Sequence, residues 1–472
     1  MKALYITHLY PPRHIGGTEH YTHSLAKGVI ALGHQTQVLC VGDWEQGERY
    51  WNGQSDDLFE GVPVRRLHLN WRKAPDIGRY SYDNPMVADY TRNYLKEIAP
   101  DVVHVTSCNT LSASVIGAAK QLGLPVVVTL TDFWFVCPRV TLMRSDGGLC
   151  DGRVAEQECV RCLFHGSKAY RWSRSILPEA ATVQLLGTLS RHGTLSRLRG
   201  VRGMAMDIRD RRARVCAALQ QADRVLIASR SARDTFRLNG VSIPIAVVPY
   251  GHDLSWLERY TGKTESRMLR LGFVGQISAA KGPQLLIEAY KNASHGGAAR
   301  LLIYGDMEKD PVFGGQLRSL ANGRQDIEFR GTYPHAESGR VFSEIDVLVV
   351  PSLWNDYPLI IHEAFATRTP VVASDSGAMK EFVQPGVNGL LFQRGSSEDL
   401  ARQLRRLIVE RDLPGRLGAA VPHVKSIAEA VAEMLMIYRD AMDTPILARD
   451  QGACAAAQPP GTEHTRRCRE GF

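Results

Sequence analysis

Residues 347–364 read VLVVPSLWNDYPLIIHEA, and this stretch decides the fold. Its first four residues, Val347–Val350, are typical of a strand that is buried on both faces in a parallel sheet. Asp356 is placed to cap a helix that has Pro358 in its first turn. We therefore predict a strand, a loop and a helix over Pro358–Ala366, in the order found in a doubly wound α/β sheet.

The loop and helix start of this stretch are predicted to bind an anionic ligand. Such sheets bind ligands at the carboxyl ends of their strands, and the N–H groups of Leu359 and Ile360 face an anion placed there. Glu363 lies one turn further on, in an otherwise apolar helix. A buried carboxylate needs a partner, which ribose hydroxyls supply, with a structural salt bridge as the alternative.

A similar unit precedes this stretch. Leu269–Val274 predicts a strand, Gly275–Gly282 a turn and Pro283–Ala293 a helix. Lys281 in the turn is placed to neutralise a diphosphate, although a solvated lysine beside a capping glycine fits as well. Further strands of this half are predicted at 300–304, 327–330 and 370–373.

The N-terminal half repeats the pattern. A strand at Ala3–Ile6 leads through a Gly/Pro loop into a helix at Thr18–Leu32, and further strands are predicted at 36–41, 102–105, 125–130 and 245–248. The adjacent Gly16 and Gly17 let a ligand approach the backbone closely, although a Gly-Gly turn before a helix is common. Two Rossmann-like halves result, joined near 249–266.

Length and composition are those of a soluble protein of two or three domains, with 472 residues, 44% hydrophobic and 22% charged. The sequence has no apolar run of 18 residues and no signal peptide. We therefore expect the protein in the cytoplasm, either free or bound to the cytoplasmic face of the membrane. The expected parts are an acceptor-side domain over 1–250, a donor-nucleotide domain over 267–425, a helix packing back over 426–444 and a disordered tail over 445–472.

The positive charge is concentrated in one segment. Residues 168–214 hold 11 Lys and Arg against 3 Asp and Glu, while the rest of the chain is balanced at 46 against 46. Apolar residues are interleaved with these cations, which suits an anionic membrane surface or a lipid-linked, phosphate-bearing acceptor. The alternative, a solvated insertion whose arginines have no binding role, is equally consistent with the sequence. No recognition motif accompanies the charge, so we expect no nucleic-acid partner.

Four cysteines cluster just before the basic segment, within an insertion over about 137–214. A Cys-x-x-Cys pair with two more cysteines within 26 residues predicts a tetrahedral thiolate site that suits structural zinc, and free loop thiols are the alternative. The predicted ligands are Cys137, Cys150, Cys159 and Cys162.

Several motifs in fixed order resemble the family 4 glycosyltransferases over about residues 1–440. They are Gly16-Gly17, 275–282, 347–364, 369–374 and 386–392. The resemblance implies the GT-B architecture, in which two Rossmann-like doubly wound domains face each other. It also implies retaining transfer of a sugar from a nucleoside diphosphate sugar, UDP- or GDP-linked, without a catalytic metal.

The resemblance also implies residue roles. Lys281 matches the position that binds the donor diphosphate, Glu363 the position that binds the ribose, and Gly16 and Gly17 lie across the cleft near phosphate and acceptor. The catalytic candidates are Asp132, Lys281 and Glu363. The donor-binding candidates are Gly16, Gly17, Gly275, Gln276, Lys281, Asn355, Asp356, Leu359, Ile360 and Glu363.

Three positions depart from the family pattern. Gln276 stands where an arginine is frequent, and Asn355 stands where the first glutamate of a pair touches the sugar. Thr131 stands where the acceptor domain often has a histidine, which leaves Asp132 as the best ionisable candidate near the reacting sugar. An aspartate that only caps the end of a strand is the equal alternative for Asp132.

We therefore expect a glycosyltransferase of hexosyltransferase type that acts on a glycan or lipid-linked acceptor in surface polysaccharide or glycolipid synthesis. A nucleotide-sugar epimerase of the same architecture is one alternative, which needs an acid and a base but no acceptor site. A non-catalytic nucleotide-sugar-binding protein is the other, and the departures at Gln276, Asn355 and Thr131 are its motivation.

Overall fold

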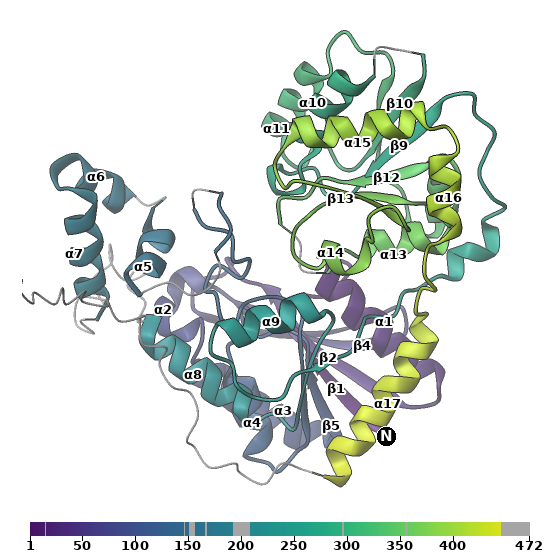
Figure 1. Cartoon of the computed structure of the whole chain (residues 1–472). Helices are drawn as coiled ribbons and strands as arrows, with labels where there is room; N and C mark the ends of the chain where they lie inside the picture. Colours follow the sequence, from purple (N-terminus) through teal and green to yellow (C-terminus); the bar gives the residue numbers. More distant parts are fainter. Residues whose placement is uncertain are drawn as a thin grey trace, which may run out of the picture.

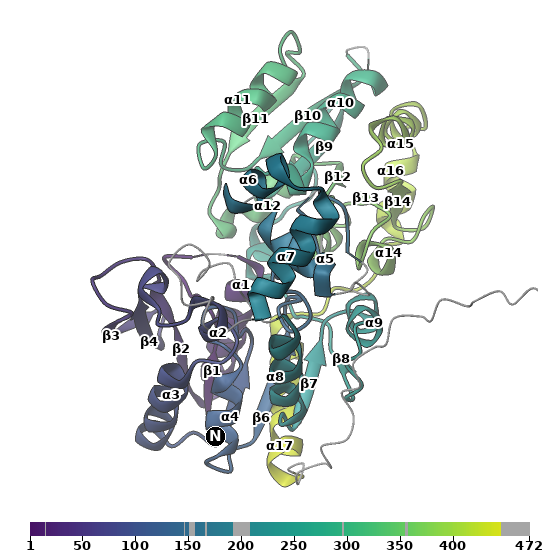
Figure 2. The ribbon, with the colours of Figure 1, turned by 90° about the vertical axis from the view of Figure 1, so that its left-hand side faces the viewer.

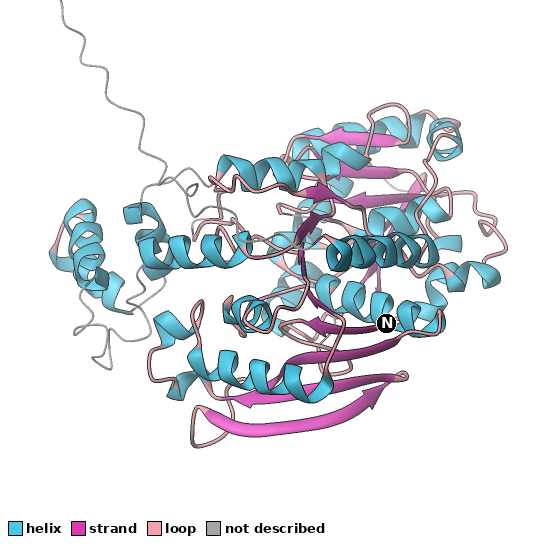
Figure 3. Cartoon of the chain, turned by 90° about the horizontal axis from the view of Figure 1, so that it is seen from below, coloured by secondary structure: helices cyan, strands magenta, loops and turns pink. Residues whose placement is uncertain are grey.

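The computed structural model contains two α/β domains, each built on its own sheet (Figure 1). Helices lie on both faces of the strands, as Figure 3 shows from below. The structure describes residues 1–14, 16–145, 147–150, 156–165, 168–191, 208–294, 297–354 and 357–444. The predicted GT-B fold class is confirmed by these two domains with predominantly parallel sheets.

The first sheet has eight strands in the order β3-β4-β2-β1-β5-β6-β7-β8. Its strands are β1 Lys2–Ile6, β2 Gln35–Asp43, β3 Trp51–Phe59, β4 Val62–Leu69, β5 Val102–Val105, β6 Val126–Leu130, β7 Arg224–Ile227 and β8 Ala246–Val247. Every neighbouring pair is parallel except β3 with β4. The β1 strand is central, because Tyr5 pairs with Val38 on one side and His104 on the other.

The β3–β4 hairpin is absent from the strands predicted by sequence. Its strands are joined at Glu60 and Gly61, which both have a positive φ, of 45° and 83°. Two such residues form the tight turn that matches the twist of a hairpin. The β3 strand lies at the edge of the sheet and is largely exposed, so it lacks the apolar run that marks the buried strands.

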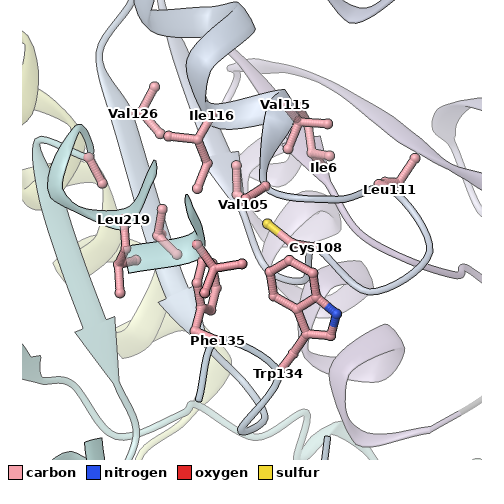
Figure 4. Packing of buried hydrophobic residues seen from close by; sticks show 14 of the residues in the cluster. Ile6, Val105, Cys108, Leu111, Val115, Ile116, Val126, Trp134, Phe135 and Leu219 are labelled. Atoms are coloured by element: carbon pink, nitrogen blue, oxygen red, sulfur yellow. The ribbon is translucent and has the colours of Figure 1, made fainter. Parts of the chain in front are cut away.

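Helices of the first domain cover both faces of this sheet, and a further group of three, over residues 156–191, stands off it. The helices of the domain are α1 Gly17–Ala31, α2 Ile77–Tyr80, α3 Pro85–Ile98, α4 Ser114–Lys120, α5 Glu156–Phe164, α6 Lys168–Ile176, α7 Glu179–Arg191, α8 Ile208–Gln220 and α9 Arg230–Leu238, with a 3-10 turn, η1, at Trp71–Lys73. Figure 4 shows part of the core, where Trp134 and Phe135 pack beside Cys108. This packing anchors the chain just after β6.

The second sheet has six parallel strands in the order β11-β10-β9-β12-β13-β14. Its strands are β9 Leu269–Val274, β10 Ala299–Tyr304, β11 Ile327–Gly331, β12 Val347–Val350, β13 Val371–Ser374 and β14 Gly389–Phe392. Five of these were predicted, each within one residue at either end. The β9 and β12 strands are neighbours, so the loops that follow them leave the same edge of the sheet.

Helices also flank the second sheet. They are α10 Pro283–Ala293, α11 Pro311–Leu320, α12 Ser338–Ser343, α13 Leu359–Ala366, α14 Met379–Phe382, α15 Ser397–Val409 and α16 Leu413–Ala419, with 3-10 turns η3 Ser255–Arg259, η4 Ala279–Lys281 and η5 His335–Glu337. The predicted start of α13 was wrong. Pro358 is extended and stands at the N-cap, without a side-chain cap, so the helix begins at Leu359.

The chain crosses between the domains twice, at adjacent points. His252 donates its backbone N–H to Lys425 O at 3.0 Å, and Ile427 donates to His252 O at 2.8 Å. The returning chain forms α17, Ile427–Asp443, which packs on the first domain, where Tyr438 bonds to Tyr5 and His104. The predicted disordered tail, 445–472, lies outside the described residues.

Helices α5, α6 and α7 form an arm that stands off the first domain, at the height where the two domains meet (Figures 1 and 2). Within the described part of the chain, no helix is long and apolar enough to cross a membrane.

Candidate active site

The loops after β9 and β12 contact each other. Leu353 donates its N–H to Ala280 O at 2.8 Å. Gly282 has a φ of +74°, and a β-carbon there would lie 2.2 Å from Pro351 O, so both backbone conformation and space require glycine. The two predicted phosphate-binding loops thus form one surface at the carboxyl edge of the second sheet.

The loop after β9 carries the predicted diphosphate contacts. Lys281 ends the η4 turn and is half-buried, whereas Gly275 and Gln276 are exposed. Asn355 and Asp356, in the loop after β12, lie outside the described residues. The part of this surface that the structure describes therefore consists of the β9 loop and the start of α13.

The α13 helix presents its N-terminus to this surface. No side chain caps it, and Leu359 and Ile360 stand at its first two positions, half-buried. Uncapped N–H groups at a helix start carry partial positive charge that attracts an anion. The phosphate contact at Leu359 and Ile360 stays a prediction.

Glu363 lies one turn into α13 and is half-buried. Burial raises the pKa of its carboxyl to about 7. The described side chains offer Glu363 no hydrogen bond or ion pair, so the structural salt bridge considered for it is not seen among them. A partly buried carboxyl without a protein partner is suited to accept hydrogen bonds from ligand hydroxyls.

The Gly16–Gly17 loop faces this surface from the first domain. Gly16 is the N-cap of α1, and Gly17 is its first residue. A β-carbon on Gly17 would lie 3.8 Å from the Leu359 side chain, which belongs to α13. The helix start of one domain therefore lies directly against the helix start of the other.

A buried ion pair beside Gly16 was not predicted. Glu19, in the first turn of α1, lies 3.3 Å from Nε2 of His8. Burial pushes the pKa of the Glu19 carboxyl upward, but the hydrogen bond and charge of His8 outweigh it and hold this pKa below its usual value. The sequence does show a glutamate in the first helical turn after the glycines, and from this position the Glu19–His8 pair could have been predicted.

Asp132 follows β6 at the same edge of the first sheet and is half-buried. One carboxyl oxygen accepts the Trp134 N–H at 2.8 Å. Burial raises the pKa of Asp132, while the Trp134 N–H and the charge of His8 act in the opposite direction. The neighbouring Thr131 hydroxyl donates to Thr106 O at 2.7 Å, so it serves the local backbone.

Other contacts hold the two domains together around this edge. Arg394 of the second domain donates to Leu353 O at 2.5 Å and to Gly147 O of the first domain at 3.4 Å. The rings of His20 in α1 and His335 in η5 lie 5.3 Å apart. The carboxyl edges of the two sheets thus face each other.

A cavity of about 490 Å³ lies elsewhere in the second domain. Its lining includes Met268, Asp346 and Pro370, which directly precede β9, β12 and β13. It therefore opens at the amino edge of the sheet, opposite the predicted donor site. None of the predicted site residues lines it.

The four clustered cysteines are partly buried, and Cys137, Cys159 and Cys162 are free thiols. The pKa of the Cys159 thiol is raised to about 12, first by burial and then by the charges of Cys137, Cys150 and Cys162. The four cysteines therefore lie close to one another. No three His, Cys, Asp or Glu side chains of the described ranges are grouped so as to hold a metal ion. Zinc binding stays a prediction, which metal analysis of the purified protein tests.

Comparison with known proteins yields two family models. The model for the glycosyl transferase 4-like domain matches residues 16–251, half of the chain, and that for glycosyl transferases group 1 matches 269–410. The D-inositol 3-phosphate glycosyltransferase 1 of Catenulispora acidiphila is 32% identical over 190 residues, which are 36% of this chain and 44% of that protein. The match thus spans less than half the length of that relative.

Longer matches are more distant. An uncharacterized glycosyltransferase of Methanocaldococcus jannaschii is 22% identical over 86% of this chain and 89% of its own. A glycosyltransferase structure from Rickettsia africae has a TM-score of 0.61 at 15% identity, covering 94% and 99% of the two chains. The Anabaena HepE structure in complex with UDP has a TM-score of 0.58 at 16% identity, with the same coverage.

The two family models fall on the two sheets in the order that the fold requires, and the solved structures share the whole architecture. The chain therefore belongs to the family 4 glycosyltransferases.

Proposed function

We propose that this chain transfers a sugar, with retention of anomeric configuration, from a nucleoside diphosphate sugar to a glycan or lipid-linked acceptor in surface polysaccharide or glycolipid synthesis. The observation that carries the proposal is the contact between the Gly17 and Leu359 helix starts, with Lys281 and Glu363 on the same edge. HepE, of the same fold, was solved with UDP and with UDP-glucose, which favours a UDP-linked donor over GDP.

The donor is bound by its leaving group. Lys281 and the N–H groups of Leu359 and Ile360 hold the diphosphate, because they offer positive charge at one edge of the sheet. Glu363 accepts hydrogen bonds from the ribose hydroxyls, for which the ionised carboxylate is the competent form. These contacts stabilise the negative charge that develops on the diphosphate as the glycosidic bond breaks.

The acceptor is bound by the first domain. Gly16 and Gly17 bring backbone close to the phosphates, and Asp132, at the end of β6, is the ionisable candidate near the reacting sugar. The predicted contact with an anionic membrane belongs to the arm, whose surface is considered below.

Ligand-induced stabilisation tests the donor site. UDP-, GDP- and ADP-sugars are added to the wild type, Lys281→Ala and Glu363→Ala. At about 100 times the dissociation constant, the correct donor stabilises the wild type by about 2.7 kcal/mol, and both variants lose this response. Lys309→Ala, which changes an exposed lysine of the same domain, is the matched control and keeps it.

If no nucleotide raises the melting temperature, or the two variants respond as the wild type does, the donor site is wrong. Transfer to a lipid extract, followed by NMR of the anomeric configuration in the product, then tests the reaction. A retained configuration supports the proposal. Inversion, epimerisation of the donor or binding without turnover contradicts it.

A further inference from the structure

The arm has an internal packing face. Tyr170 of α6 is buried, and its hydroxyl donates to Glu179 of α7 at 3.1 Å. Arg161 of α5 pairs with the same carboxylate at 2.8 Å. Ser173, one turn after Tyr170, is buried as well. These contacts fix which side of α6 faces its neighbours.

The opposite side of α6 is apolar and exposed. Trp172 is 69% and Ile176 61% exposed. At 3.6 residues per turn, Trp172 and Ile176 lie about 200° and 240° round the helix from Tyr170, on the side away from α7. We call these two residues the outer face of α6. Isolated exposed apolar side chains are common, but an exposed tryptophan one turn from an exposed isoleucine marks an interaction surface.

The outer face lies in the segment that accounts for the chain's net positive charge, because residues 168–214 carry 11 Lys and Arg against 3 Asp and Glu and the rest of the chain is balanced. Some of these cations serve the first domain. Arg211 donates to Trp134 O, Arg212 to Asn239 O, and Arg214 pairs with Asp83. Three others, Lys168, Arg171 and Arg174, belong by sequence to α6 itself, which has no acidic residue.

We propose that the outer face of α6 docks on an anionic lipid bilayer, with Trp172 and Ile176 entering the headgroup region and the nearby cations facing lipid phosphates. Tryptophan favours this region because its ring is apolar and its N–H remains able to bond to water. Apolar burial and attraction to anionic lipids add together in such contacts, and the net charge favours an anionic bilayer over an uncharged protein groove.

Docking does not depend on the proposed transfer reaction, but the two fit together. The arm stands at the height where the domains meet (Figures 1 and 2), so a bilayer held by α6 lies beside the facing edges of the two sheets. A lipid-linked acceptor in that bilayer is then concentrated near the first domain.

Vesicle flotation of the full-length protein tests the docking. Vesicles of phosphatidylcholine alone are compared with vesicles of equal parts phosphatidylcholine and phosphatidylglycerol. We expect binding to the anionic vesicles, a loss of about tenfold or more in Trp172→Ser/Ile176→Ser, and release at about 1 M salt, where charges are screened within about 3 Å. Val312→Ser/Val409→Ser, which changes two 74% exposed valines of the second domain, is the matched control and keeps wild-type binding.

Three results overturn the proposal: no binding to anionic vesicles, equal binding to neutral vesicles, or wild-type binding by the Trp172→Ser/Ile176→Ser variant. Self-association that the same variant abolishes, seen by light scattering without vesicles, identifies a second copy as the occupant and also overturns it. The thermal response to donor nucleotide is measured on every variant. Its retention shows that the variant is folded, and it separates failure of docking from failure of the donor site.

Discussion

Gly17 and Leu359 belong to different domains, yet a β-carbon on Gly17 would lie only 3.8 Å from the Leu359 side chain. That distance is ordinary van der Waals contact, so the pair marks where the two helix starts meet without a clash. Gly16 differs, because a β-carbon there would lie 2.6 Å from the Glu19 carboxylate. Packing within the protein therefore disfavours a side chain at Gly16 but leaves room for one at Gly17.

This difference predicts opposite effects of one substitution. Gly17→Ala fits a helical position, so we expect unchanged or slightly higher stability, by up to about 1 kcal/mol. Gly16→Ala displaces Glu19 from His8 and removes a favourable N-cap residue, at a cost of about 1–2 kcal/mol. Urea unfolding measures both. Equal stability of the two variants would contradict the role given to the Glu19–His8 pair.

Glu363→Gln is predicted to raise stability while weakening donor binding. Below its unfolded pKa of about 4.5 the carboxyl is protonated in both states. As pH rises towards about 7, the unfolded chain releases the proton before the folded chain does, so the wild type loses stability over this window. The amide has no such loss, and the variant is expected to be more stable by about 1–3 kcal/mol at about pH 8.

Thermal melts of wild type and Glu363→Gln at pH values from about 5 to 8 check this dependence. The stability difference shrinks towards the acid end, whereas the donor-induced stabilisation is weaker in the variant throughout. Glu265→Gln, an exposed control in the same domain, leaves both quantities unchanged. A variant that binds donor as well as the wild type refutes the ribose contact.

The variant Asp132→Asn tests whether Asp132 acts as a catalytic carboxyl or only caps the end of β6. The amide oxygen still accepts the Trp134 N–H, so the turn after β6 is kept while the negative charge is removed. We expect kcat to fall about 100-fold or more with donor binding unchanged, as when a charge beside a reacting group is lost. Activity near that of the wild type assigns Asp132 to the cap alone.

Gly251→Ala is predicted to loosen the crossing between the domains. A β-carbon there would lie 2.4 Å from the Ala430 side chain and 2.5 Å from Ser426 O. Neither position yields easily, because both belong to the start of α17, so we expect a cost of about 1–3 kcal/mol. Calorimetry measures it. Gly315→Ala is the control, because a β-carbon there would have no neighbour within 4 Å. Gly262→Ala is unsuitable as a control, because its φ of +113° strains any side chain.

The sequence predicted those parts of the fold and site that rest on local chemistry. The β12 strand and the α10 helix have the predicted bounds, because a run of buried valines and a proline after glycine are strong local signals. The loops around Gly282 and Gly17 were expected at carboxyl edges because parallel sheets place them there.

Other features depend on contacts between distant residues. The β3 strand at the sheet edge has no apolar pattern, and the Glu19–His8 pair forms only when β1 and α1 are packed. The neutral-range pKa of Glu363 comes from burial by surrounding elements, which no spacing of residues reveals. Contact between Gly17 and Leu359 likewise requires the relative placement of two domains.

The paired crossings at His252 and Ile427 also bear on how such a chain diversifies. Because the outgoing and returning segments leave from one point, residues 253–425 are attached as an insert whose two ends are already together. Recombination that exchanges this insert keeps the first sheet and its α17 partner intact. Donor recognition can therefore change as a module, while the acceptor side and the arm are inherited unchanged.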